Sequence, residues 1–400
     1  MSGPTELYKP EAFEPLTDTP WNEARVADAI QRIVDAAESA FDEKALWPAG
    51  EWESWHMPLP LKSLYVGAAG VVWALHALRN RGRADGRLDL ANAIARIHGA
   101  WQSEPDLMRD IELPTTAEAA LLTGETGILM TAWLIDPTAE RADRLHERVR
   151  ENAANEAIEV MWGAPGTMLA AAELHRRTGE ERWADAWRES ARNLLGSREP
   201  DGLWTSKLYG ELRRSLTPPH GMVGNVHALL DGGALLDAVQ RETLQSQTTD
   251  VLRRTAVVED GVANWPPQAD GSLVGPDGEI RVQWCAGSPG IVIAAAPYLD
   301  EDLMLAGAEL VWQAGAHGHE KGPSICHGTA GNGYALLRTF ERTRDERWLE
   351  RARRFAMHAL EQVDRREYRY ALWTGDVGAA LFASDCLDAR AAYPILETWA

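Results

Sequence analysis

Two cysteines and one histidine stand beside glycine-punctuated turns and have the residue types of a metal site. Cys285 lies in "RVQWCAGSPGI", and Cys326 and His327 are adjacent in "KGPSICHGTAGNG". Two thiolates and one imidazole suit Zn²⁺, and three protein ligands leave a fourth position open, as in catalytic zinc sites. The same residues also fit a second interpretation, in which the cysteines are small buried hydrophobic residues and the histidine is hydrogen-bonded in the core. Spacing alone leaves both interpretations open.

The elements that would have to position these residues are marked by a repeat, a Gly-x-x-Gly followed by an apolar segment, and this combination occurs seven times. The copies start 39 to 66 residues apart, which suits one helical hairpin each, and an apolar segment rich in small residues follows every copy. If all the turns meet at one end of a ring, the two cysteines and the histidine come together. The copies begin at Gly67, Gly124, Gly163, Gly221, Gly287, Gly328 and Gly375.

Segments of a different character lie between the glycine copies. In "ERWADAWRESARNLL", Trp183 and Trp187 fall at helical spacing among charged residues, and "DERWLERARRFAMHAL" repeats this pattern around Trp348. Such segments are typical of helices with one apolar face. Inner helices covered by outer helices predict an all-α fold, an α/α toroid of six or seven hairpins. We expect one domain over residues 1–400, with residues 1–20 as an N-terminal arm, either flexible or packed.

The composition excludes several classes of protein. The chain has 400 residues and a formal net charge of -20, which argues against nucleic-acid binding because phosphate contacts require a basic surface. The sequence contains neither a signal-peptide pattern nor an apolar run long enough to span a membrane, so we expect a cytoplasmic protein. Three cysteines cannot form a disulfide framework. Cys386 stands apart from the glycine turns, and burial is its favoured interpretation.

The combination of these motifs resembles the lanthionine synthetase C family. "WCAGSPG" and "CHGTAGN" carry the resemblance, and the longer stretches "SLYVGAAG", "NWPPQ" and "KGPSICHGTAGNGYALL" are most similar to the stand-alone, glutathione-binding LanC-like branch. The resemblance extends from about residue 60 to 385. It implies an α/α toroid that binds zinc through the residues matching Cys285, Cys326 and His327.

The resemblance also implies an activity and further site residues. In the family, a zinc-bound thiolate adds to the β-carbon of dehydroalanine or dehydrobutyrine in a peptide or protein and forms a thioether, as a lyase or transferase would. His220 in "PPHGMVG" matches the proposed proton donor. Arg281 matches the family arginine that could stabilise the enolate or orient a carboxylate. Lys321 matches a lysine that contacts glutathione in the stand-alone branch. Arg281 and Lys321 also fit as surface ion-pair partners.

Two departures bear on the substrate. Ala120 occupies the place, four residues before the second glycine copy, where the family has an acidic residue implicated in cyclisation. Glu118 and Glu125 are near in sequence, but a shift of two residues on a helix points to another face. Ala286 replaces a histidine that commonly follows the first zinc cysteine in the branch. We therefore expect glutathione addition more than peptide cyclisation, although the second departure weakens the case for glutathione recognition.

Three alternatives remain. One is a lanthionine-forming cyclase that acts with a separate dehydratase, and another is a non-catalytic sensor that binds zinc and glutathione. The third comes from the 17 tryptophans, because helical toroids with aromatic cavities also serve carbohydrate enzymes that use paired carboxylates. Glu125 and Asp376 are the candidate acids for that chemistry. Some tryptophans lie outside the amphipathic segments and favour the carbohydrate alternative. They include Trp52, Trp55, Trp162, Trp204, Trp284 and Trp373.

Overall fold

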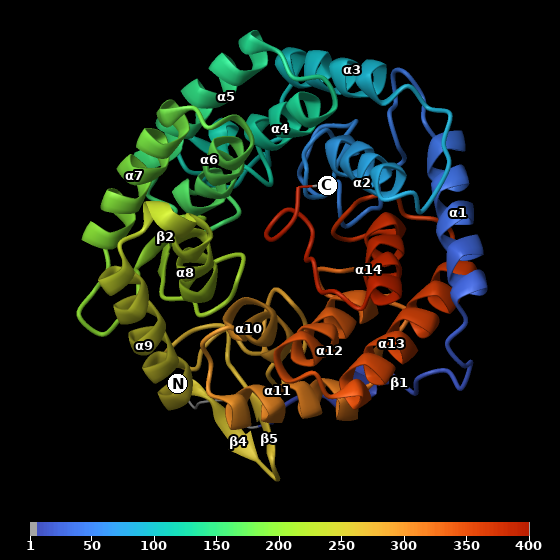
Figure 1. Ribbon diagram of the computed structural model, residues 1–400, viewed down its shortest axis with the longest axis vertical. Coiled ribbons are helices and arrows are strands. Elements are labelled where there is room, and N and C mark those ends of the chain that lie inside the picture. Colours follow the sequence, from blue (N-terminus) through green and yellow to red (C-terminus); the bar gives the residue numbers. More distant parts are fainter. Residues whose placement is uncertain (1–5, 400) are drawn as a thin grey trace.

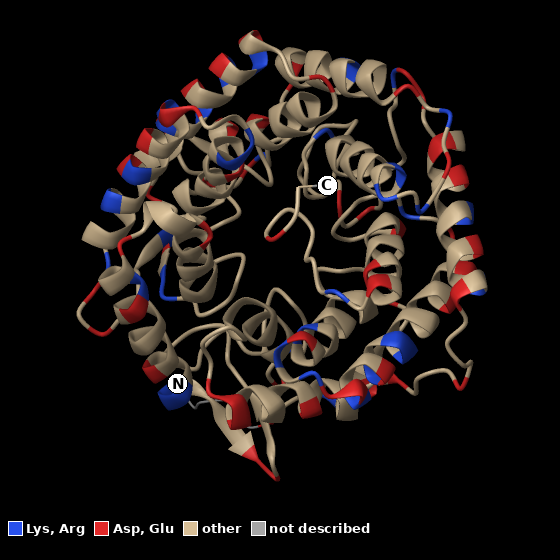
Figure 2. Ribbon diagram, in the orientation of Figure 1, with Lys and Arg blue, Asp and Glu red and all other residues tan. Residues whose placement is uncertain are grey.

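The computed structural model describes residues 6–399. Within these residues, fourteen α-helices form two concentric rings, which confirms the expected α/α toroid (Figure 1). Charged residues gather on the outer ring, and the inner ring carries few of them (Figure 2). No helix in this part of the chain combines the length and the apolar character that crossing a membrane requires.

Each inner helix begins one residue after the first glycine of a Gly-x-x-Gly copy, as the repeat predicts. These helices are apolar on nearly all sides, and every residue of α10 is buried. The inner helices are α2 (Ala68–Asn80), α4 (Glu125–Ile135), α6 (Ala164–Thr178), α8 (Met222–Asp231), α10 (Ser288–Ala295), α12 (Thr329–Thr343) and α14 (Asp376–Asp388).

The second glycine of each copy allows a close approach between two stretches of backbone. A Cβ atom at Gly290 would lie 2.0 Å from the carbonyl oxygen of Trp284, six residues earlier. The equivalent atom at Gly70 would lie 2.3 Å from the carbonyl oxygen of Leu64. Because a side chain fits at neither position, the repeat folds the residues before each inner helix tightly over its first turn. Those folded residues include the cysteines.

The outer helices show the one-sided pattern expected from the sequence. On α7, for example, Trp183 and Trp187 are buried against the inner ring, while the charged residues face outward. The outer helices are α1 (Glu23–Ser39), α3 (Leu90–Ser103), α5 (Ala139–Glu151), α7 (Glu181–Gly196), α9 (Ala238–Thr255), α11 (Glu301–Ala314) and α13 (Glu346–Asp364).

Helices from opposite ends of the sequence close the ring. Each inner helix contacts the next inner helix, and α14 contacts α2 to complete the circle. Six inner helices pair with the outer helix that follows them in the sequence, whereas α14 is covered by α1 (Figure 1). The toroid therefore has seven helix pairs, six formed by consecutive helices and one formed across the whole chain.

Short antiparallel strand pairs accompany the helices of the ring. In one of them Phe13 lies opposite His317, and this pairing holds the described part of the N-terminal arm against the ring. Asn264 Nδ2 also donates a hydrogen bond to the Leu7 carbonyl oxygen at 2.7 Å, so the arm is packed from residue 6 onward. The pairs are β1 (Phe13–Glu14) with β6 (Ala316–His317), β2 (Ser206–Leu208) with β3 (Glu211–Arg213), and β4 (Val257–Glu259) with β5 (Val262–Asn264).

Candidate metal centre and active-site cavity

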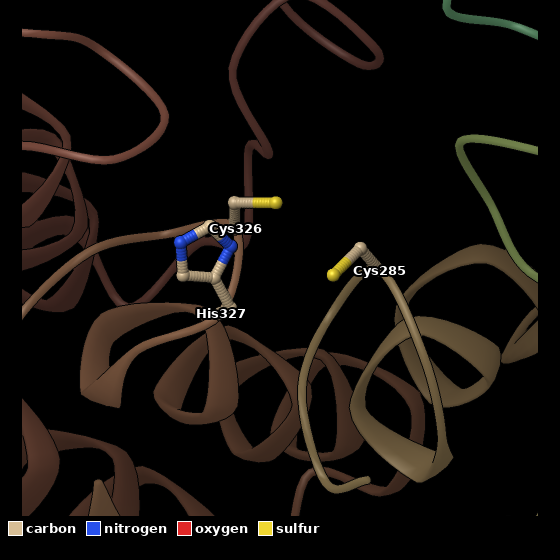
Figure 3. A group of neighbouring side chains, drawn as sticks. All are labelled: Cys285, Cys326 and His327. Atoms are coloured by element: carbon tan, nitrogen blue, oxygen red, sulfur yellow. The ribbon is translucent and has the colours of Figure 1, made fainter. Parts of the chain in front are cut away.

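The structure brings Cys285, Cys326 and His327 together. Their ligand atoms all lie within 4.8 Å of one another. The two sulfur atoms and the imidazole ring point toward a shared space between the turns that precede α10 and α12 (Figure 3). Cys326 is buried, and Cys285 and His327 are half-buried, so a small ligand can still reach the group.

The donor set and its spacing fit Zn²⁺. Zinc–sulfur bonds of about 2.3 Å and zinc–nitrogen bonds of about 2.0 Å keep pairs of ligand atoms less than about 4.6 Å apart. The observed limit of 4.8 Å lies slightly above that bound, so a small inward movement of the side chains would bring all three ligand atoms to one ion. A group of two thiolates and one imidazole therefore suits a zinc ion with one coordination position left for a further ligand.

Equivalent positions of the repeat supply the site residues. Cys285 and Cys326 each stand two residues before the first glycine of their copies, and His220 and His327 each stand immediately before it. All of these residues belong to the folded segments that precede inner helices. In six of the seven copies at least one of these two positions lines the central cavity, and residue type decides which copies carry chemistry.

A chain of backbone hydrogen bonds connects these segments around the ring. The Cys285 amide donates to the Cys326 carbonyl oxygen at 3.3 Å, and the Cys326 amide donates to Trp373 at 2.9 Å. The Trp373 amide donates to Tyr65 at 3.4 Å, and the Tyr65 amide donates to Leu122 at 2.8 Å. Successive turns are thus fixed relative to one another, which sets the separation of the two sulfur atoms.

Each sulfur atom also contacts a polar side chain. The Tyr65 hydroxyl lies 2.9 Å from Cys326 Sγ, and Gln283 Nε2 donates a hydrogen bond to Cys285 Sγ at 2.9 Å. The Trp52 ring packs edge-on against His327 with the ring centroids 5.2 Å apart. Every candidate ligand therefore has a neighbour that restricts its orientation.

The two thiols have opposite pKa shifts. A hydrogen bond from Cys326, with a further contribution from His327, lowers the pKa of Cys285 well below its ordinary value. Burial raises the pKa of Cys326. Burial, followed by the nearby charge of Cys326, also raises the pKa of Tyr65, so its hydroxyl remains protonated at neutral pH.

A cavity of 630 Å³ lies against the cluster and contains the other predicted site residues. Cys285 and His327 line it together with His220, Arg281 and Lys321. A volume of this size can hold a peptide-sized ligand. Arg281 is exposed and lies on the wall that this cavity shares with a second cavity of 360 Å³, and Lys321 lies on the same wall.

His220 is held by a carboxylate that the sequence analysis did not identify. Glu159 is fully buried, and its Oε2 atom lies 2.8 Å from His220 Nδ1. Backbone amides of Met161 and Trp162 donate to the same carboxylate at 3.1 and 2.6 Å. Glu159 therefore fixes the imidazole and leaves Nε2 as the nitrogen that is free to face the cavity.

Neither acidic residue near Ala120 replaces the missing carboxylate. Glu125 Oε2 accepts a hydrogen bond from Arg148 Nε at 2.5 Å, and Glu118 lies 3.3 Å from the same guanidinium group. These contacts direct both side chains toward α5. Two other carboxylates, Glu53 and Asp106, line the main cavity instead.

The two acids that the sequence suggested for carbohydrate chemistry do not lie at the cavity. Asp376 forms an ion pair with Arg366 at 2.5 Å, and Glu125 belongs to the Arg148 cluster. Neither carboxylate lines the 630 Å³ cavity. The tryptophans divide into two groups, because Trp52, Trp55 and Trp162 line the cavity whereas Trp204, Trp284 and Trp373 are buried in the core. Cys386 is buried on α14, as expected.

The fold and the cluster together define a helical toroid with a thiolate and imidazole site at its centre. Residues 62–396 match the family described as Lanthionine synthetase C-like protein. Because this match covers most of the chain, the chain belongs to the lanthionine synthetase C-like family.

Individual relatives agree with this assignment. The Glutathione S-transferase LANCL1 of Danio rerio is 35% identical over 141 residues, which span 31% of this chain and 33% of that protein. Nisin cyclase superimposes with a TM-score of 0.58 at 15% identity, covering 92% of this chain and 95% of that chain, and so shares the fold. A sugar epimerase from a ruminal bacterium gives a TM-score of 0.46 at 11% identity over 92% of this chain, too weak a likeness to support the carbohydrate alternative.

Proposed function

We propose that this protein adds a thiol, with glutathione as the preferred donor, to dehydroalanine or dehydrobutyrine in a peptide or protein. The observation that carries the proposal is the position of the Cys285, Cys326 and His327 cluster. It forms part of the wall of a cavity that is also lined by a carboxylate-bound histidine and by the cationic side chains of Arg213, Arg281 and Lys321. Thiol activation, proton donation and anion binding are thereby available in one place.

The residues divide the chemistry among them. A Zn²⁺ ion bound by the cluster would supply a Lewis acid that lowers the pKa of a coordinated thiol, so that the thiol releases its proton to water at neutral pH. In the addition, a sulfur–carbon bond forms at the β-carbon of the acceptor while the carbon–carbon double bond shifts its electrons toward the carbonyl group. His220 Nε2 then delivers one proton to the α-carbon, and Glu159 balances the charge of the protonated imidazole. The net change is the addition of one S–H across one C=C bond.

Two cations support glutathione as the donor. Glutathione carries two carboxylates, and the Arg281 guanidinium presents a planar fork of donors at the cavity wall. The Lys321 Nζ atom lies 3.6 Å from a carboxylate oxygen of Glu320, which makes a weak ion pair. A substrate carboxylate can replace Glu320 in this pair. The name of the Danio rerio relative, Glutathione S-transferase LANCL1, points in the same direction. A cysteine inside a peptide offers no such pair of carboxylates.

Incubation with glutathione and a dehydroalanine-containing peptide tests the function. We expect about one zinc per chain by elemental analysis and a peptide mass increased by one glutathione. The Cys285→Ala variant is the matched control and should form adduct only at the uncatalysed rate. Glutathione binding without turnover would instead indicate the sensor, and cyclisation of a dehydrated peptide that contains cysteine would indicate the cyclase.

An Arg281→Gln variant tests the choice of donor. We expect the KM for glutathione to rise about tenfold or more, because a charge-assisted contact is worth about 1.5 to 3 kcal/mol. The KM for cysteamine, a thiol without a carboxylate, should stay unchanged. An equal effect on both thiols would show that Arg281 does not bind the donor's carboxylate.

A further inference from the structure

Each candidate sulfur ligand has a polar side-chain partner that lines the cavity. Tyr65 OH lies 2.9 Å from Cys326 Sγ, and Gln283 Nε2 lies 2.9 Å from Cys285 Sγ. Tyr65 and Gln283 also line the 630 Å³ cavity, as Cys285 does, so both contacts lie at the edge of the space available to substrates. Neither residue belongs to the three-ligand cluster.

The direction of the Tyr65 hydrogen bond follows from the chemistry of the cluster. A thiol loses its proton when it binds a metal, so Cys326 Sγ in the loaded site can only accept. The Tyr65 hydroxyl must then be the donor. A hydrogen bond from a neutral group to a charged sulfur is of the stronger, charge-assisted kind.

The ring fixes the distance between Tyr65 and Cys326. Trp373 connects them, because its amide donates to the Tyr65 carbonyl oxygen at 3.4 Å and its own carbonyl oxygen accepts from the Cys326 amide at 2.9 Å. The Tyr65 ring also packs against the Trp373 ring at a centroid distance of 5.7 Å. Tyr65 stands two residues before its glycine copy, the same position that the two cysteines occupy in theirs. The hydroxyl is therefore placed by the same backbone arrangement that places the ligands.

We propose that Tyr65 is a positioning residue of the metal centre, whose hydroxyl donates a hydrogen bond to the metal-bound thiolate of Cys326, with Gln283 doing the same for Cys285. Part of the negative charge of each ligand sulfur is then drawn away from the metal, which remains a stronger Lewis acid toward the incoming thiol. The ligand sulfurs also become weaker nucleophiles. This matters because the acceptor is an electrophile that would otherwise alkylate the ligands.

This inference rests on the metal site of the proposed function but not on its substrates, so its test uses the metal alone. The test loads the full chain with Co²⁺ in place of Zn²⁺ and records the sulfur-to-cobalt charge-transfer band in the wild type and in Tyr65→Phe. A more electron-rich thiolate should shift the band to lower energy in the variant. Competition with a chelator should also show metal affinity weakened by about 10- to 100-fold.

Tyr393→Phe is the matched control. Tyr393 is buried beside the same cluster, but its hydroxyl donates to the Ile325 carbonyl oxygen at 2.7 Å and not to sulfur. We expect its band to stay at the wild-type position. The inference fails if the Tyr65→Phe band and affinity equal those of the wild type, or if both variants shift alike, which would indicate general loosening. A wild type that binds neither Co²⁺ nor Zn²⁺ would overturn both this inference and the proposed metal site.

Discussion

Replacing Glu125 with glutamine should destabilise the ring and leave the chemistry unchanged. The Glu125 side chain is 2% exposed and accepts hydrogen bonds from His98 Nε2 at 2.8 Å and from Arg148 Nε at 2.5 Å. It thereby joins α4 to α3 and α5. Glutamine keeps the shape of the side chain but removes the charge that compensates the buried Arg148 guanidinium.

The pKa of Glu125 sets the size of the effect. Burial alone would raise this pKa, but hydrogen bonds from His98 and Arg148 outweigh burial and lower it from 4.5 to about 2. At about 1.4 kcal/mol per pH unit, that difference corresponds to about 3 kcal/mol of folding free energy at pH 7. Because the folded-state pKa is the lower one, this stability is present above about pH 5. It is lost progressively as the pH falls from about 4.5 toward 2.

Urea unfolding followed by tryptophan fluorescence at pH 7 measures the change. We expect the midpoint to fall for Glu125→Gln by an amount equivalent to about 2 to 4 kcal/mol. Glu104→Gln is the control, because Glu104 pairs with Arg109 on the surface and should change the midpoint little. Turnover per folded molecule should match the wild type. A stable variant with lost turnover would refute this reasoning and give Glu125 a catalytic role.

Two further substitutions test the site and the repeat. Glu159→Gln should lower turnover about 10- to 100-fold without weakening glutathione binding by calorimetry. The loss should be smaller than for His220→Ala, which removes the proposed proton donor itself. Equal binding losses in both variants would contradict a role in proton transfer. Gly290→Ala should cost about 1 to 3 kcal/mol in thermal unfolding and reduce bound zinc, because the new methyl group would meet the Trp284 carbonyl oxygen at 2.0 Å. Gly99→Ala is the control, because a Cβ atom at Gly99 would have no other atom within 4 Å. This substitution in a helix should leave stability unchanged or raise it. A similar loss of stability there would show that the contact with the carbonyl oxygen is not the cause.

The repeat predicts the fold well because one physical constraint recurs in it. A residue with a side chain cannot sit where Gly290 or Gly70 approaches an earlier carbonyl oxygen, so each copy marks the start of an inner helix. For Cys285, Cys326 and His327 the residue types and spacing leave burial open as an alternative, and the resemblance to the lanthionine synthetase C family is what favours metal binding.

Positions that depend on ring neighbours could not be predicted in this way. Glu159 stands four residues before the third glycine copy, the place that Ala120 occupies before the second, and its contact with His220 spans 61 residues of sequence. A search confined to the second copy therefore misses it. The residues that flank Tyr65 in the sequence do not indicate a role at a metal site. Only the order of the turns around the ring brings Tyr65 to Cys326. An alignment of the seven copies by their glycines would have shown that Tyr65 shares the position of the cysteines.

The pairing of α1 with α14 distinguishes this toroid from open solenoids. In a solenoid each repeat contacts only its neighbours, and the ends can fray while the middle stays folded. Here α14 contacts both α2 and α1 and so closes the circle, and the hydrogen bond between Tyr65 and Cys326 joins residues 261 positions apart across this closure. Loosening α1 on the outside should therefore release the metal at the centre. Zinc loss and global unfolding should follow a single denaturation curve, and two separate transitions would mean that the halves of the circle melt independently.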